Sequence, residues 1–177
     1  DGYFWYDHYV PQNLTNYYEY LDYFAVSAEV SADYQPALNF IRPAIEQVNG
    51  MASDREKVTY LNDYLCGLMS YDRKAAAGVS QVFTRHSGEI AGACGSYTHN
   101  FKFLCGAAGI PCFTIRTDNH SWNLVYADGQ WLHVDVAAND HYNRPYILLA
   151  ETVSGRADVS PAATEFLKEL LAPGSTK

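Results

Sequence analysis

Cys94, His120 and Asp135 have the residue types that thiol-dependent acyl transfer requires. In such chemistry a cysteine thiolate attacks a carboxamide or peptide carbonyl, an imidazole takes the thiol proton, and a carboxylate fixes the imidazole tautomer. The three residues lie far apart along the chain. The prediction therefore depends on the elements that would bring their side chains together.

The first such element is a helix that we expect to start at about Cys94, in the stretch GACGSYTHNFKFLCGAAGIP, and to stop at Gly109 and Pro111. Helical spacing predicts a shared face of Tyr97, Phe101, Leu104, Cys105 and Ala108. Unpaired backbone N–H groups and the positive dipole end at a helix start favour a thiolate and can hold a developing oxyanion. We expect Gly92 and Gly95 to keep the approach to the sulfur open.

The other three cysteines lack this setting. Cys66 lies beside an apolar helical stripe and is expected to be a small buried hydrophobe. Cys105 lies three turns along the helix that Cys94 starts, and Cys112 lies inside a predicted strand, CFTIRT. The spacing contains no CxxC pair, which argues against a zinc ribbon.

A hairpin is the second element that the chemistry needs. The stretch NHSWNLVYADGQWLHVD holds two alternating runs joined by Asp128 and Gly129, a dipeptide typical of a type I′ turn. In the resulting register Trp122 lies opposite Asp135, and side-chain alternation places both on one face with His120. His120 and Asp135 are then diagonal neighbours with Cα atoms roughly 7–8 Å apart, so we expect their side chains to meet.

Other interpretations of these residues stay open. His133 shares the face of Asp135 and could serve as the base, although it lies deeper in the hairpin. Taken singly, Cys94 could be a buried structural cysteine, His120 a strand end, and Asp135 a turn cap. A metal site of His120, His133 and Asp135 lacks the short histidine spacing typical of zinc. We therefore expect no metal, and the motifs for nucleotides and calcium are missing, so no cofactor.

The preceding elements form a helical scaffold. The stretch PALNFIRPAIEQVNG predicts a helix that ends at Gly50 and is kinked or restarted at Pro43. Ser53 and Glu56 form a capping box that opens the next helix. Its buried stripe is predicted to be Val58, Leu61, Leu65, Leu68 and Met69. Residues 72–93 are rich in Gly, Ala and Ser and predict a loop.

The ends of the chain predict an aromatic arm over residues 1–35, irregular or with a short strand, and a helix over 160–172 capped by Ser160. We expect a single domain over 1–177 with its core at 53–150. The abrupt start, DGYFWYDHY, leads us to expect a mature or excised piece.

The amino-acid composition argues against some classes of binding partner. The net charge is −8, with 12 Lys and Arg against 20 Asp and Glu. This balance argues against nucleic acid and anionic lipid, which both require clustered basic residues. No apolar run approaches the roughly 20 residues of a membrane helix. The 15 tyrosines and scarce lysines favour an extracellular or cell-surface location. Nothing in the sequence indicates the oligomeric state.

The stretch GACGSYTHNFKFLCGAAGIPCFTIRTDNHSWNLVYADGQWLHVDVAAND resembles the core of the transglutaminase-like superfamily. The shared pattern is G-x-C at a helix start, Gly-Ile-Pro before a strand, His-x-Trp-Asn and Trp-x-x-Val-Asp. The segment SDREKVTYLNDYLCGLMSYD is similar to the helix and Tyr-Asp that precede the cysteine in bacterial members. The resemblance implies an α+β, papain-like core, with the nucleophile starting a central helix packed on an antiparallel sheet.

Carried over position by position, the resemblance implies Cys94 as nucleophile, His120 as base and Asp135 as orienting acid. Tyr71 matches the family's tyrosine before the loop and is the candidate oxyanion donor. We also take Trp122 as a candidate for substrate contact.

The implied function is acyl transfer on protein or peptide amides, with an amine or water as acceptor. A cysteine protease or amidase acting on peptides or cell-wall peptide is the alternative. A third possibility is a non-catalytic binding module on the same fold.

Overall fold

The structure is a computed structural model that describes residues 3–5, 28–84, 88–116, 120–143 and 147–149. The predicted C-terminal helix and most of the predicted aromatic arm lie outside these residues. The division of the chain into an arm, a core and a C-terminal helix stays a prediction.

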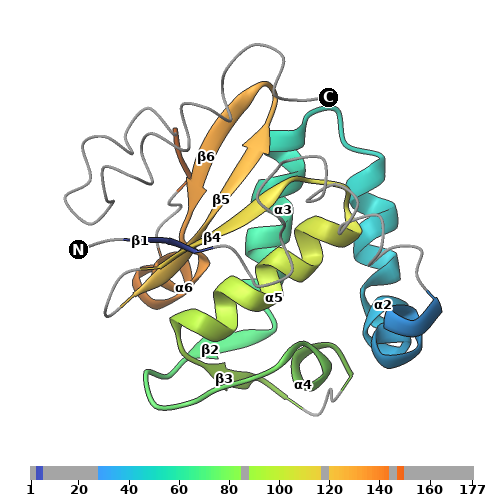
Figure 1. The fold of residues 1–177 in the computed structure, drawn as a ribbon, viewed down its shortest axis with the longest axis vertical. Helices are drawn as coiled ribbons and strands as arrows, with labels where there is room; N and C mark the ends of the chain where they lie inside the picture. The colour runs from blue at the N-terminus through green and yellow to red at the C-terminus, as the bar shows by residue number, and fades with distance from the viewer. Residues whose placement is uncertain (1–2, 6–27, 85–87, 117–119, 144–146, 150–177) are drawn as a thin grey trace.

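An antiparallel sheet of five strands forms one side of the domain, in the order β1-β4-β5-β6-β7 (Figure 1). Its strands are β1 (Tyr3–Trp5), β4 (Cys112–Arg116), β5 (Ser121–Ala127), β6 (Gln130–Val134) and β7 (Ile147–Leu149). Every neighbouring pair is antiparallel. The N-terminal segment thus contributes a short edge strand, one of the two forms expected for it.

The helices form the rest of the domain, together with a small parallel pair of strands. The helices are α2 (Ala28–Asn49), α3 (Asp54–Cys66), α4 (Val79–Thr84), α5 (Cys94–Ala107) and α6 (Val136–Tyr142). The parallel pair consists of β2 (Met69–Tyr71) and β3 (Ile90–Gly92).

Helix α5 is the centre of the fold (Figure 1). It contacts the strands β4 and β5 on one side and the other four helices around it. Its residues from Ser96 to Gly106, apart from His99, are buried. The predicted helix start at Cys94 is confirmed, as is the α+β class with that residue at the beginning of a central helix on an antiparallel sheet.

Helix α2 does not restart at Pro43, which was one of the two effects expected of this proline. It begins at Ala28, before the predicted start, and runs through both Pro36 and Pro43. A proline removes one helical hydrogen bond and costs stability. A continuous buried stripe offsets that cost, because the helix loses this packing if it breaks. The stripe consists of Ala37, Ile41, Ala44 and Val48.

Helix α3 begins as its capping sequence predicts. The Ser53 hydroxyl accepts from the Glu56 N–H at 3.1 Å, and the Glu56 carboxylate accepts from the Ala52 N–H at 3.2 Å. The helix ends at Cys66, sooner than the apolar stripe predicts. Met69 is fully buried, but as the first residue of β2.

The segment 72–93 is not the continuous loop that its composition predicts. It contains the short helix α4 and the strand β3. Val82 and Phe83 of α4 are fully buried. Two apolar side chains on a helix this short leave too little periodicity for recognition in the sequence, and their tertiary packing decides the structure.

The hairpin turn lies where the sequence predicts it. Asp128 and Gly129 have φ of 50° and 77°, and Ala127 pairs with Gln130. The Asp128 carboxylate accepts from the backbone N–H groups of Asp54 at 2.9 Å and Arg55 at 3.0 Å. These bonds to the N-terminus of α3 lower the pKa of Asp128 and anchor the tip of the hairpin.

We expect Gly92→Ala to destabilise the protein by about 1–3 kcal/mol through overpacking. A Cβ at Gly92 would lie 2.5 Å from Met69 Cε and 2.9 Å from Ser96 Cβ. Gly95→Ala is the matched control, because a Cβ there meets nothing within 4 Å. Urea unfolding measures both variants. Equal stability of the two would contradict the packing role of Gly92.

Candidate active site

The sulfur of Cys94 lies at a helix start that is left open. Ala93, the N-cap, has extended backbone angles, and among the described residues no side chain caps this end. The N–H groups of Ser96 and Tyr97 donate to Ala93 O at 2.9 and 3.2 Å. The preceding N–H groups of Cys94 and Gly95 are therefore placed to face an anion at the helix start.

The two glycines beside Cys94 differ in role, which corrects one prediction. Gly95 is exposed, with open space around its Cα, as expected for an accessible approach. Gly92 is buried against Met69 and Ser96 and is required for packing. It does not open a path to the sulfur.

His120 and Asp135 meet, as predicted. His120 Nε2 lies 2.6 Å from Asp135 Oδ2. The last residue pair of the hairpin is Asn123 with Val134, and the chain then leaves the sheet. The expected pairing of Trp122 with Asp135 is therefore not part of the ladder.

Asp135 has two roles, one for each carboxylate oxygen. While Oδ2 bonds His120, Oδ1 accepts from the Ala138 N–H at 3.0 Å and caps helix α6. The capping role and the orienting role were alternative interpretations of the sequence, and the geometry contains both. Because the cap holds the carboxylate in one orientation, Oδ2 faces the imidazole without a further positioning group.

Hydrogen bonding between Cys94 and His120 shifts the pKa of both groups. The bond with His120 is the main cause that lowers the pKa of Cys94 to about 7, against the opposing effect of burial. The bond with Asp135, followed by that with Cys94, raises the pKa of His120 to about 9. Between these two values the pair is a thiolate beside an imidazolium. With Nε2 on Asp135, Nδ1 is the ring nitrogen left for the sulfur.

The indole ring of Trp122 packs against one face of the His120 imidazole. Its ring stacks on His120 with centroids 5.7 Å apart, and its Nε1 donates to His133 Nδ1 at 2.8 Å. Trp122 is only 1% exposed, which leaves almost no surface for the substrate contact expected of it. His133 is equally buried and bonded to this indole, and the carboxylate of Asp135 is bonded to His120. The geometry thus favours His120 over His133 as the base.

Tyr71, the candidate oxyanion donor, lies in β2 opposite Gly92. Its ring packs 4.8 Å from His141 and 6.4 Å from Tyr97. The hydroxyl of Tyr97 in turn donates to the Asp140 carboxylate. Tyr71 is therefore near the segment that leads into α5, and its role as a donor stays a prediction.

Asn123 links the start of α5 to the sheet, a structural role that the sequence did not predict. Its Nδ2 donates to Thr98 O at 3.1 Å and lies 3.4 Å from Phe113 O. This fully buried amide joins the first turns of α5 to β4 and β5. The His-x-Trp-Asn motif contains the signal, since a buried asparagine in a strand needs partners for its two N–H groups.

The remaining cysteines differ from Cys94 in ionisation. Burial is the main cause that raises the pKa of Cys66 to about 12 and that of Cys105 well above the ordinary thiol value. Cys66 is half-buried at the edge of the core, slightly more open than predicted. All four cysteines are free thiols.

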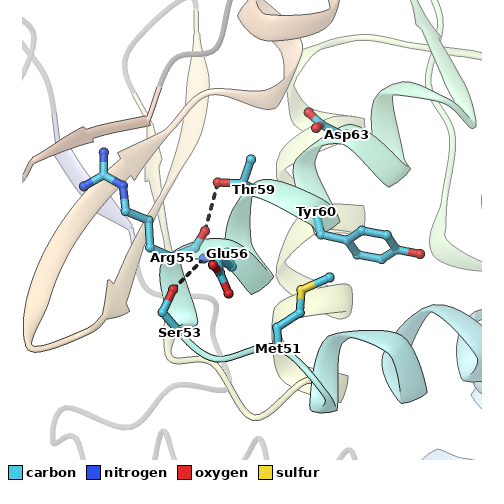
Figure 2. A pocket seen from close by; sticks show the side chains of 7 residues that line it. All are labelled: Met51, Ser53, Arg55, Glu56, Thr59, Tyr60 and Asp63. Carbon is cyan, nitrogen blue, oxygen red and sulfur yellow. Dashed lines mark hydrogen bonds between the residues drawn. The ribbon is translucent and has the colours of Figure 1, made fainter.

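A separate hollow of about 650 Å³ runs along α3 (Figure 2). Its lining residues are Met51, Ser53, Arg55, Glu56, Thr59, Tyr60 and Asp63. None of the three predicted catalytic residues lines it.

Over the ranges that the structure describes, no three His, Cys, Asp or Glu side chains cluster as metal ligands. Within the same ranges, no helix has the length and apolar character to cross a membrane.

Comparisons with known proteins identify the family to which this chain belongs. A crystal structure of a "Putative Cysteine Protease from Cytophaga hutchinsonii" matches with a TM-score of 0.46 and 21% identity, over 64% of this chain and 41% of that chain. The chain thus spans less than half of that protein's length. No curated protein matches it. The model of the transglutaminase-like superfamily matches residues 42–136, more than half of the 177 residues, and includes all three predicted catalytic positions. This chain belongs to the transglutaminase-like superfamily.

Proposed function

We propose that the protein is a thiol-dependent acyltransferase or hydrolase that acts on protein or peptide amides through Cys94, His120 and Asp135. The observation that carries the proposal is the position of His120, whose Nε2 lies 2.6 Å from Asp135 Oδ2. Hydrogen bonding with His120 is also the main cause that lowers the pKa of Cys94. This is the arrangement of nucleophile, base and orienting acid that covalent acyl transfer uses. The superfamily supports a thiol enzyme.

The first half-reaction follows from the ion pair. The Cys94 thiolate attacks the amide carbonyl, and the open N–H groups at the start of α5 stabilise the negative oxygen. The imidazolium of His120 gives its proton to the departing nitrogen as the C–N bond breaks. An amine leaves, and the acyl group stays on the sulfur as a thioester.

The second half-reaction reverses the proton transfer. Water or an amine attacks the thioester, neutral His120 takes its proton, and the thiolate leaves. Water gives hydrolysis, and an amine gives crosslinking or transfer. Asp135 stabilises the imidazolium at both stages, as an orienting carboxylate does.

The partner and the location belong to the same proposal. The acyl donor is a protein or peptide amide, with cell-wall peptide as the alternative donor for a protease or amidase. The acidic surface, with a net charge of −8, favours a cationic acceptor over an anionic one. An extracellular or cell-surface location agrees with the composition.

Alkylation separates an enzyme from a binding module on the same fold. We expect iodoacetamide to modify Cys94 with a half-maximal rate near pH 7 and to modify Cys66 far more slowly, since the pKa values are about 7 and about 12. Peptide mapping by mass spectrometry resolves the two sites. If Cys94 reacts no faster than Cys66, the thiolate and the enzyme proposal are both wrong.

Turnover identifies the acceptor. We expect a glutamine peptide, incubated with a labelled primary amine, either to incorporate the amine or to release ammonia or cleavage products without incorporation. The first result defines a transferase and the second a hydrolase. Cys94→Ala should abolish both, and Cys66→Ala serves as the cysteine control. Activity that survives in Cys94→Ala contradicts the assignment.

The pH profile should be bell-shaped. Activity rises as Cys94 ionises near pH 7 and falls as His120 loses its proton near pH 9. Asp135→Asn removes the largest cause that raises the pKa of His120, so the alkaline limb should move to lower pH. Asparagine keeps the α6 cap, so the fold is retained. An alkaline limb that does not move in Asp135→Asn excludes this carboxylate as the orienting group.

A further inference from the structure

Ser121, between His120 and Trp122, lies at the point where β5 meets the start of α5. It is the first residue of β5 and is 6% exposed. Its Oγ lies 3.2 Å from the hydroxyl of Thr98. Thr98 is one turn along α5 from Cys94 and donates to Cys94 O at 2.8 Å.

Counting protons shows that these hydroxyls are not equivalent. A hydroxyl has one proton to donate. The Thr98 proton is committed to the Cys94 carbonyl, so only Ser121 can supply the proton for the contact between the two hydroxyls. Hydrogen bonding from the backbone and from the side chain of Ser121 is among the causes that lower the pKa of Cys94. The single Ser121 proton therefore has two acceptors within reach.

We propose that Ser121 is a switchable donor, whose hydroxyl bonds the Cys94 sulfur when it is a thiolate and Thr98 Oγ1 when the sulfur is neutral or acylated. A hydrogen bond to an anion is about twice as strong as one between neutral groups, so the thiolate takes the proton. A thioester sulfur is a poor acceptor. Thr98 then prevents the buried hydroxyl from losing its partner.

The switch acts on both half-reactions of the proposed function, on which its acylation step rests. In the free enzyme it increases the fraction of Cys94 present as thiolate near neutral pH. When the thioester breaks, the hydroxyl turns back and stabilises the departing sulfur. Thr98 is then a positioning residue, which acts on the sulfur only through Ser121.

Alkylation of the intact chain tests the thiolate contact without requiring turnover. We expect Ser121→Ala to slow the modification of Cys94 by iodoacetamide at pH 7, on the order of 3-fold to 10-fold, and to move its pH midpoint upward. Ser121→Thr keeps the donor and should retain the wild-type profile. A folded Ser121→Ala protein with an unchanged midpoint overturns the proposal.

Thr98→Val tests the second position of the switch. The Cys94 midpoint should not rise in this variant, because the Ser121 proton still reaches the sulfur. At pH 8, where wild-type Cys94 is ionised, Thr98→Val should lower the melting temperature more in carbamidomethylated protein than in free thiolate protein. Two results would contradict the proposal: an equal loss of melting temperature in the two protein forms, or a Cys94 alkylation midpoint that rises as it does in Ser121→Ala. Either result would mean that the two hydroxyls act as one structural unit.

The results can contradict the switch and the proposed acyl-transfer function independently of each other. If the midpoint shifts in Ser121→Ala but no amide substrate is turned over, the acyl-transfer proposal is wrong while the thiolate contact stands. If turnover occurs and the midpoint does not shift, only the switch is wrong.

Discussion

The contact between the start of helix α5 and the start of strand β5 is the constraint on which the site depends. Cys94 has a defined position only because its helix is held against the sheet, and His120 only because β5 begins there. Asn123 makes this contact specific, since its buried amide bonds Thr98 O of the helix at 3.1 Å. A purely apolar contact would allow the helix to slide, whereas an unsatisfied buried amide penalises every other register.

The second constraint is the use of one residue for two purposes. Asp135 ends β6, caps α6 and bonds His120, so the carboxylate is positioned by the secondary structure itself. Its Oδ1 is occupied by the Ala138 N–H, which leaves Oδ2 for the imidazole. Trp122 adds a flat, buried support beneath the same ring. The imidazole is thus held by a carboxylate at its edge and by an indole on its face, which is the rigid support that a reacting group requires.

The ion pair of Cys94 and His120 has its physical origin in hydrogen bonding that outweighs the effect of burial on the thiol. Burial alone would raise the thiol pKa, as it does for Cys66 and Cys105. Hydrogen bonds from His120 and Ser121 more than compensate for this cost at Cys94. Two half-buried thiols, Cys66 and Cys94, therefore differ in chemistry because hydrogen bonds at Cys94 offset the effect of burial, which is the main cause of the raised pKa at Cys66.

Local sequence signals were enough to predict the helix that starts at Cys94, the turn at Asp128 and Gly129, and the meeting of His120 with Asp135. These features follow from local rules. Glycine, proline and helical spacing mark where a helix begins and ends, and a two-residue turn sets the pairing of the two strands of a hairpin. Tertiary packing was needed to bury Trp122, to place Gly92 against Met69, and to bring the hydroxyls of Ser121 and Thr98 to 3.2 Å from each other. Those outcomes depend on which faces of distant elements touch, and no local pattern contains that information.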